Sequence, residues 1–196
     1  MKKIIFKSLT LLNFKGVRAL HVDFGEGLTI ISGRNATGKT SIADAIMWVL
    51  FDTGYDGNKL EPKTYNKEGR IIKEIPHEVT LVLQCNDEKY SLKRGLYDAW
   101  KGNECRNTYK YYLNDEVVTA GEYKKTVDAI CPEDVFRLCS STKDFVYRPW
   151  QEQRNKLQTL VGDITTDDIT EGNRKYDFVV EALKKQDIDK LVHHIK

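Results

Sequence analysis

The segment from Gly33 to Thr40, Gly-Arg-Asn-Ala-Thr-Gly-Lys-Thr, constrains this chain more than any other feature. It fits the pattern Gly-x-x-x-x-Gly-Lys-Thr, with an apolar β-branched run at 28–31 before it and an apolar helical pattern at 40–51 after it. That strand, loop and helix context is what the pattern requires of a phosphate-binding loop. Glycines let successive backbone N–H groups point inward at phosphate oxygens. The segment therefore predicts a site for a nucleoside triphosphate, which we take to be ATP with Mg²⁺.

Two residues of the loop have specific predicted roles. The Lys39 ammonium is expected to contact the β- and γ-phosphates, and the Thr40 hydroxyl is expected to bind Mg²⁺. The N-terminus of the following helix adds the positive end of its dipole. Chance is a poor explanation, because the bare pattern arises in roughly 1% of chains of this length at ordinary residue frequencies.

Size and composition exclude several other classes of protein. The chain has 196 residues and a formal net charge of +2, which suggests one domain, with a small helical appendage at most, and no large field of one sign. No apolar stretch approaches the roughly 18 residues of a membrane span. Cysteine and histidine spacings match no metal-binding pattern, so we expect reduced thiols, no metal site made by protein ligands alone and a cytoplasmic location.

Beyond the loop, alternating apolar residues predict strands over 3–12, 17–24, 77–85, 89–96 and 108–113. The run at 28–31 predicts a buried central strand, and 52–70 predicts a loop. Short turns such as Asn86-Asp87 favour an antiparallel arrangement of the later strands over parallel strands alternating with helices. Helical patterns follow at 122–130, 132–138, 150–161 and 173–185, the last with Thr170 as a candidate N-cap.

The stretch LTLLNFKGVRALHVDFGEGLTIISGRNATGKTSIADAIMWVLF, residues 9–51, resembles the N-terminal head segment of the SMC, SbcC and RecF class of ABC-type ATPases. A second stretch at 133–164 resembles the lobe that follows it in SbcC-like and phage relatives. The resemblance implies an α/β P-loop NTPase fold with a mixed or antiparallel sheet and a helical C-terminal part. It also implies a nucleotide-binding lobe over 1–120 and a helical lobe over 121–196 that leads toward a coiled-coil root.

The resemblance carries site residues onto this chain. The nucleotide would contact the loop and the start of the next helix, which are Gly33, Arg34, Asn35, Ala36, Thr37, Gly38, Lys39, Thr40 and Ser41. Lys15 matches a basic or polar turn position that approaches the nucleotide in relatives. The alternative for Lys15 is a solvated turn lysine.

The sequence departs from the family pattern in two places. The family's metal- and water-sensing glutamine has no match within Leu138–Arg148, where Ser140, Ser141 or Asp144 could substitute, and Gln151 and Gln153 lie beyond it. The family's second half, with its LSGG-like signature, acidic strand and catalytic glutamate, has no match either. We therefore assign no catalytic residue and expect little hydrolysis by this chain alone.

The leading hypothesis is the ATP-binding half of an SMC- or SbcC-like ATPase that acts on DNA in repair, recombination or phage-related processing. Its expected partners are the C-terminal half of the same head or a second head, DNA and a nuclease subunit, with no membrane. Basic residues near Lys101–Lys125, interleaved with tyrosines, form either a phosphate-contacting face or a solvated edge.

Two other functions remain possible. One is a nucleotide-dependent regulatory or dimerisation half-domain. The other is a small P-loop kinase or GTPase, which the antiparallel pattern disfavours. The segment Asn58-Lys59-Leu60-Glu61 also misses the Asn-Lys-x-Asp motif by which GTPases recognise the base.

Overall fold

The structure is a computed structural model that describes residues 2–35, 37–66, 68–101, 104–141, 145–161 and 181. The chain divides into two compact units, Met1–Ser141 and Thr142–Lys196. The lobes that the sequence predicts, 1–120 and 121–196, stay a prediction. None of the described helices is long and apolar enough to cross a membrane.

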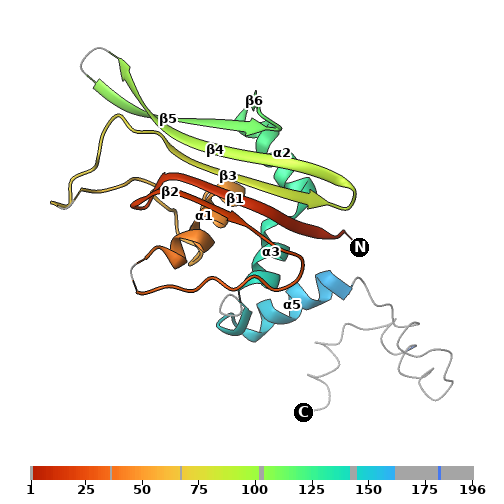
Figure 1. The fold of residues 1–196 in the computed structure, drawn as a ribbon. Coiled ribbons are helices and arrows are strands. Elements are labelled where there is room, and N and C mark those ends of the chain that lie inside the picture. Colours follow the sequence, from red (N-terminus) through yellow and green to blue (C-terminus); the bar gives the residue numbers. More distant parts are fainter. Residues whose placement is uncertain are drawn as a thin grey trace. The chain divides into compact units, whose positions relative to one another are not determined.

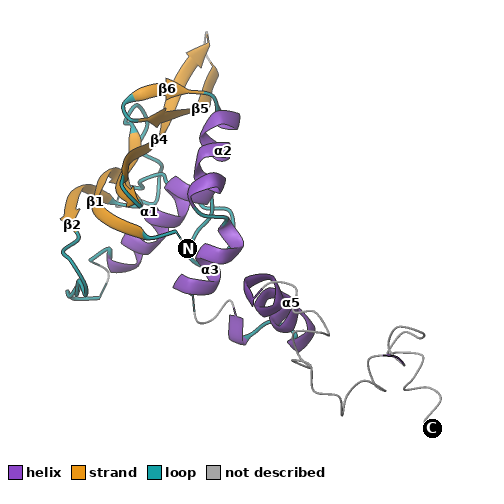
Figure 2. Ribbon diagram, turned by 90° about the vertical axis from the view of Figure 1, so that its right-hand side faces the viewer, coloured by secondary structure: helices purple, strands orange, loops and turns teal. Residues whose placement is uncertain are grey.

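The first unit is a sheet with helices on it (Figure 1). Its elements are β1 (Ile4–Phe14), β2 (Val17–Asp23), α1 (Lys39–Phe51), β3 (His77–Cys85), β4 (Glu88–Lys101), β5 (Glu104–Leu113), β6 (Glu116–Val118), α2 (Ala120–Ile130) and α3 (Glu133–Ser140). Figure 2 shows α1 and α2 together on one face of this sheet. The strands predicted near 3–12, 17–24, 77–85, 89–96 and 108–113 are all confirmed, and the last two are longer than predicted.

The six strands lie in the order β2-β1-β3-β4-β5-β6, and each neighbouring pair is antiparallel. Two-residue turns connect β1 to β2, β3 to β4 and β5 to β6. In the last turn Asn114 and Asp115 both have positive φ, +50° and +68°, which is the conformation that matches the twist of paired strands. The antiparallel arrangement predicted for the later strands is confirmed.

The core lies between the sheet and α1. Alternate residues of β3, including Val79, Leu81 and Leu83, are fully buried on one face, as the period of a half-buried strand requires. From the helix, Trp48 is completely buried, and its ring centroid lies 5.5 Å from that of Phe14 in β1. The apolar circumference of 40–51 predicted a helix inside the domain, and this prediction is confirmed.

A buried arginine that sequence reasoning did not assign ties α1 to the sheet. Arg94 of β4 is 4% exposed, donates to the Trp48 carbonyl at 3.1 Å and forms an ion pair with Asp52 at 2.6 Å. Its guanidinium also lies over the rings of Trp48 and Tyr111, 4.9 and 5.2 Å from their centroids. Burial of this charge is tolerated because each of these partners stabilises it.

Helix α2 packs beside α1 and begins with a capping box. The Thr119 hydroxyl accepts from the Glu122 N–H, and the Glu122 carboxylate accepts from the Thr119 N–H. Tyr123 on its buried face donates to the Val49 carbonyl at 2.9 Å. Burial raises the pKa of Tyr123, so its hydroxyl stays protonated as this bond requires.

The predicted helix at 150–161 is confirmed as α5 (Trp150–Val161), which belongs to the second unit. The helix predicted at 132–138 is also confirmed, as α3, with Pro132 at its N-cap instead of inside its first turn. The helix predicted at 173–185 and its candidate cap Thr170 lie outside the described residues.

The prediction for 28–31 is wrong for this structure. The segment forms no strand, and Leu28, Ile30 and Ile31 are 86%, 79% and 40% exposed. An apolar β-branched run signals a strand only when neighbouring strands cover it, and no described strand pairs with this segment. The segment instead leads into the phosphate loop as irregular, largely exposed chain.

Candidate functional site

The candidate site is the loop that joins the exposed segment 28–32 to α1. Gly38 is the N-cap of α1 with φ +90°, and a Cβ there would lie 2.9 Å from Val17 Cγ2. Only glycine fits such a position, because both its backbone angle and its neighbour exclude a side chain. No side chain caps α1 and no acidic residue lies in its first turn. The free N–H groups of this helix end therefore attract an anion.

Lys39 is folded over the loop that precedes it. Its ammonium donates to the carbonyls of Gly33 at 2.7 Å and Arg34 at 2.6 Å. The Thr37 hydroxyl donates to the Arg34 carbonyl at 2.8 Å. These contacts place the ammonium inside the curve of the loop, where phosphate oxygens could exchange for the carbonyls because a charged acceptor makes the stronger bond.

The other predicted loop residues differ in exposure. Thr40 is exposed at the start of α1, whereas Ser41 is buried beside it. Arg34 and Asn35 are exposed, and Ala36 lies outside the described residues. The structure thus brings the described predicted residues into one loop and helix start, and their contacts with a nucleotide stay a prediction.

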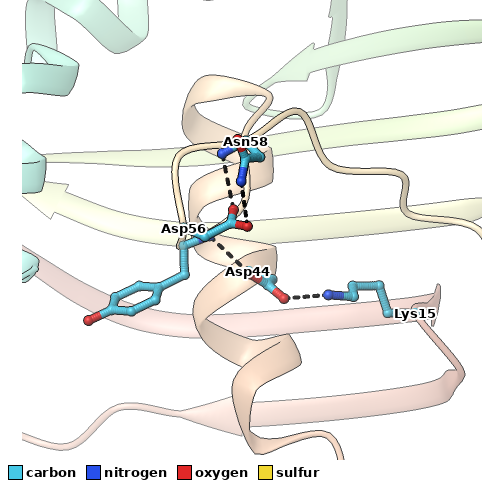
Figure 3. Close-up of polar contacts among 5 residues, drawn as sticks. Lys15, Asp44, Asp56 and Asn58 are labelled. Carbon is cyan, nitrogen blue, oxygen red and sulfur yellow. Dashed lines mark hydrogen bonds and ion pairs between the residues drawn. The ribbon is translucent and has the colours of Figure 1, made fainter. Parts of the chain in front are cut away.

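Lys15 lies in the two-residue turn between β1 and β2, and its ammonium reaches α1. Its Nζ atom is 2.5 Å from Asp44 Oδ2, while Asp44 Oδ1 accepts from the Tyr55 N–H at 2.9 Å (Figure 3). The Lys15 side chain is 37% exposed and that of Asp44 is 9% exposed. Asp44 follows Thr40 by one helical turn, so this ion pair lies on the same side of α1 as the predicted Mg²⁺ ligand.

Sequence reasoning gave Asp44 no role, although a signal was present. It is the only acidic residue between Lys39 and Phe51, in a helix that is otherwise apolar after Ser41. A carboxylate is seldom buried without a partner. That rule predicts a cationic partner, but the sequence does not identify Lys15, which lies 29 residues away.

A cavity of about 350 Å³ opens beside this ion pair. It is lined by Lys15, Thr40, Asp44, Tyr55, Asp56, Lys59, Leu60 and Glu61. Hydrogen bonds from the Asn58 side chain and backbone lower the pKa of Asp56. The lining therefore carries charges of both signs, from lysines on one hand and from Asp and Glu carboxylates on the other. No group of three or more His, Cys, Asp or Glu among the described residues is arranged to hold a metal ion.

Of the candidate substitutes for the sensor glutamine, Ser140 ends α3 and Ser141 is 5% exposed. Asp144 lies outside the described residues. In the second unit the Gln153 side-chain amide donates to the Arg148 carbonyl at 2.7 Å, and Gln151 is exposed in the same helix. These contacts identify none of the described candidates as the side chain that replaces the sensor glutamine.

The basic residues and tyrosines that the sequence predicts to form one surface lie on both faces of the sheet. Tyr111 packs against Tyr123 of α2 with the two rings tilted and their centroids 5.2 Å apart. Lys110 and Tyr112 alternate with Tyr111 along β5 and project from the opposite face, since successive side chains of a strand point to opposite sides. There Lys110 lies over the Tyr97 ring at 5.1 Å and Lys93 over the Tyr112 ring at 5.1 Å.

Comparison with known proteins adds evidence from outside the chain. A family model described as an AAA domain matches residues 8–194. The DNA double-strand break repair Rad50 ATPase of Archaeoglobus fulgidus is 27% identical over 92 residues, which are 46% of this chain and 10% of that protein. The DNA replication and repair protein RecF of Clostridioides difficile is 34% identical over 67 residues, 34% of this chain and 18% of RecF.

Among solved structures, the Smc head domain with a coiled coil and joint from Pyrococcus yayanosii matches with a TM-score of 0.51. The match is 22% identical and covers 93% of this chain and 36% of that one. Identity at this level supports the fold alone. The chain spans well under two thirds of the length of each of these relatives.

Proposed function

The chain belongs to the AAA domain family, whose model covers residues 8–194, and from this premise we propose that it is the ATP-binding part of an SMC-, Rad50- or RecF-like ATPase. The sheet is antiparallel throughout its described strands, unlike the parallel sheet of a small P-loop kinase. The observation that carries the proposal is the Lys39 ammonium inside the curve of the loop, next to the uncapped end of α1.

In the proposed complex, the triphosphate lies along Gly33–Ser41. Backbone N–H groups of Gly38 and the first turn of α1 bind its oxygens, and Lys39 moves from the Gly33 and Arg34 carbonyls to the β- and γ-phosphates. The exposed Thr40 hydroxyl binds Mg²⁺. Asp44 is too closely engaged by Lys15 and the Tyr55 N–H to be a direct metal ligand as it stands.

We further propose that hydrolysis needs groups from a second segment, in the same polypeptide or in another head. Phosphoryl transfer requires a positioned water and charges that stabilise the transferred group, and the sequence supplies neither a signature nor an acidic strand. The exposed side chains of Leu28 and Ile30 support this view. We expect the second segment to cover this exposed apolar stretch beside the phosphate loop when it docks.

The proposed cellular role is DNA repair or recombination, in the pattern of the relatives. Rad50 and RecF are named for DNA break repair and for DNA replication and repair. In this role ATP would hold two heads together, and hydrolysis would release them, which would control access to DNA or to a nuclease subunit. The lysines and tyrosines on the face of β4 and β5 opposite α2 are the candidate DNA contacts.

Titration calorimetry with Mg-ATP tests nucleotide binding by this chain. Lys39→Ala is expected to weaken binding by at least tenfold, because it removes a charge-assisted contact to phosphate. Lys89→Ala is the matched control, since Lys89 is exposed beside the β3–β4 turn and pairs with Gln84, which pairs with Ile5 at the end of β1 opposite Lys15. Equal affinities of the wild type and Lys39→Ala for Mg-ATP would refute the proposed function.

A further inference from the structure

The turn that carries Lys15 has a backbone conformation that is unfavourable for a lysine. Asn13, Lys15 and Gly16 have φ values of +51°, +47° and +86°. Phe14 pairs with Val17, so Lys15 and Gly16 alone form the turn. Such turns strongly favour Asn-Gly or Asp-Gly because both central residues need positive φ. A lysine at the first position is strained, and strain of this kind persists only where surrounding contacts enforce it.

Thr64 supplies those contacts from a distant part of the chain. Its hydroxyl donates to the Asn13 carbonyl at 2.8 Å and accepts from the Gly16 N–H at 3.2 Å, so it spans the turn from one end to the other. The Lys15 N–H donates to the Pro62 carbonyl at 3.0 Å. Thr64 is 7% exposed, so water cannot readily replace these bonds.

A second buried side chain supports the same turn. His77 is 2% exposed, and its Nδ1 atom lies 2.6 Å from the carbonyl oxygen of Asn13. The Asn13 side chain donates to the Pro76 carbonyl at 2.9 Å. The main chain on both sides of Lys15 is therefore fixed by residues from the segment between α1 and β3 and by the first residue of β3.

The fixed backbone limits where the Lys15 ammonium can lie. With its backbone fixed, the side chain extends to Asp44 and borders the cavity that Thr40 also lines. We propose that Thr64 is a positioning residue for triphosphate binding, which acts by holding the Lys15 turn so that the ammonium stays beside the phosphate loop. This inference rests on the proposed function, because it assigns Lys15 to the bound triphosphate.

A graded series at Thr64 tests the proposal on the full 196-residue chain, with Mg-ATP and Mg-tripolyphosphate as the two probes. Thr64→Val keeps the shape and removes both hydrogen bonds, so affinity for both probes is expected to fall about fivefold. Thr64→Ser keeps both bonds and is expected to bind within about twofold of wild type. The affinity of Thr64→Cys is expected to lie between those of the other two variants, because a thiol forms only weak hydrogen bonds. This variant replaces Thr64→Val in the test if Thr64→Val does not fold.

The same substitutions in a Lys15→Ala background separate positioning from general stability. Thr64→Val and Thr64→Cys are expected to add less than about twofold there, because their effect passes through Lys15. Equal losses with and without Lys15 would overturn the proposal, as would a series that does not follow hydrogen-bonding capacity. Circular dichroism melting of each variant without ligand identifies any loss that reflects unfolding.

The outcome at Lys39 distinguishes failure of this inference from failure of the proposed function. If Lys39→Ala abolishes binding while the Thr64 series binds like wild type, only the positioning role is lost. If the wild-type chain binds neither Mg-ATP nor Mg-tripolyphosphate, both proposals are lost.

Discussion

At the scale of single residues, Gly38 fixes the geometry of the phosphate loop. Its φ of +90° turns the chain into α1, and its missing side chain leaves room for Val17 of β2. The end of α1 therefore lies against the sheet with its first N–H groups uncapped by any side chain. One backbone position thus decides both the packing and the anion-binding potential of the loop.

We expect Gly38→Ala to lower the free energy of unfolding by about 1–3 kcal/mol, because alanine is strained at positive φ and its Cβ meets Val17. Gly25→Ala is the matched control, since a Cβ there meets nothing within 4 Å and no positive φ is involved. It should change stability by less than about 0.5 kcal/mol. Urea denaturation followed by circular dichroism measures both, and equal stability of the two variants would contradict the expectation.

At the scale of elements, α2 shows how a sequence pattern becomes a helix boundary. The pattern Thr119-x-x-Glu122 gives a capping box, and Tyr123, Val127 and Ile130 then form the buried stripe. Hydrogen bonds from the Thr119 backbone and side chain lower the pKa of Glu122. A lowered pKa in the folded state adds stability at neutral pH, and this contribution is lost as the pH falls through that value.

Thr119→Ala is expected to lower the free energy of unfolding by about 1 kcal/mol at pH 7, the usual cost of removing an N-cap. Thr126→Ala in the same helix is the control, because its hydroxyl only bonds back to the Glu122 carbonyl and alanine favours the helix interior. The difference between wild type and Thr119→Ala should shrink as the pH falls through the lowered pKa of Glu122, because protonation weakens the carboxylate as an acceptor. A difference that stays constant as the pH falls from 7 through this titration would argue against the capping box.

The sequence predicted the elements better than the contacts between them. Alternation in 77–85 and the apolar circumference of 40–51 are local signals, so β3 and α1 could be placed before the structure was known. The Lys15–Asp44 ion pair joins residues 29 positions apart, and the Thr64 hydroxyl bonds to Asn13 and Gly16, about 50 positions away. No local pattern specifies such partners. The site could therefore be predicted as a loop, but not with the side chains that support it.

The strand predicted at 28–31 is the informative failure. Its composition indicates burial, yet Leu28 and Ile30 are among the most exposed large apolar side chains described. Local composition indicates that a segment is suited to a buried strand. It does not indicate whether the neighbouring strands that would cover the segment are present. Residues 28–31 have the composition of a buried strand but are exposed, and this difference supports the proposal that a second segment docks on them.

At the scale of the whole molecule, this exposed segment leads to a distinct expectation. Leu28→Ser combined with Ile30→Ser should change the stability of the chain by less than about 0.5 kcal/mol, because neither side chain is buried. The same double substitution should reduce self-association in sedimentation velocity runs at increasing concentration. Leu81→Ala is the contrast, since Leu81 is fully buried and its truncation should cost about 2–5 kcal/mol. A large loss of stability in the double variant would show that 28–31 is packed in solution.

Amide NMR shift mapping tests most directly where a triphosphate binds on this chain. Addition of Mg-tripolyphosphate to ¹⁵N-labelled chain should shift the backbone amides of Gly38, Lys39 and Thr40 most strongly, with smaller changes at Lys15 and Gly16. The Lys39→Ala variant should show little change under the same conditions. Shifts that cluster instead on the face of β4 and β5 opposite α2, or that persist unchanged in Lys39→Ala, would contradict the proposed site.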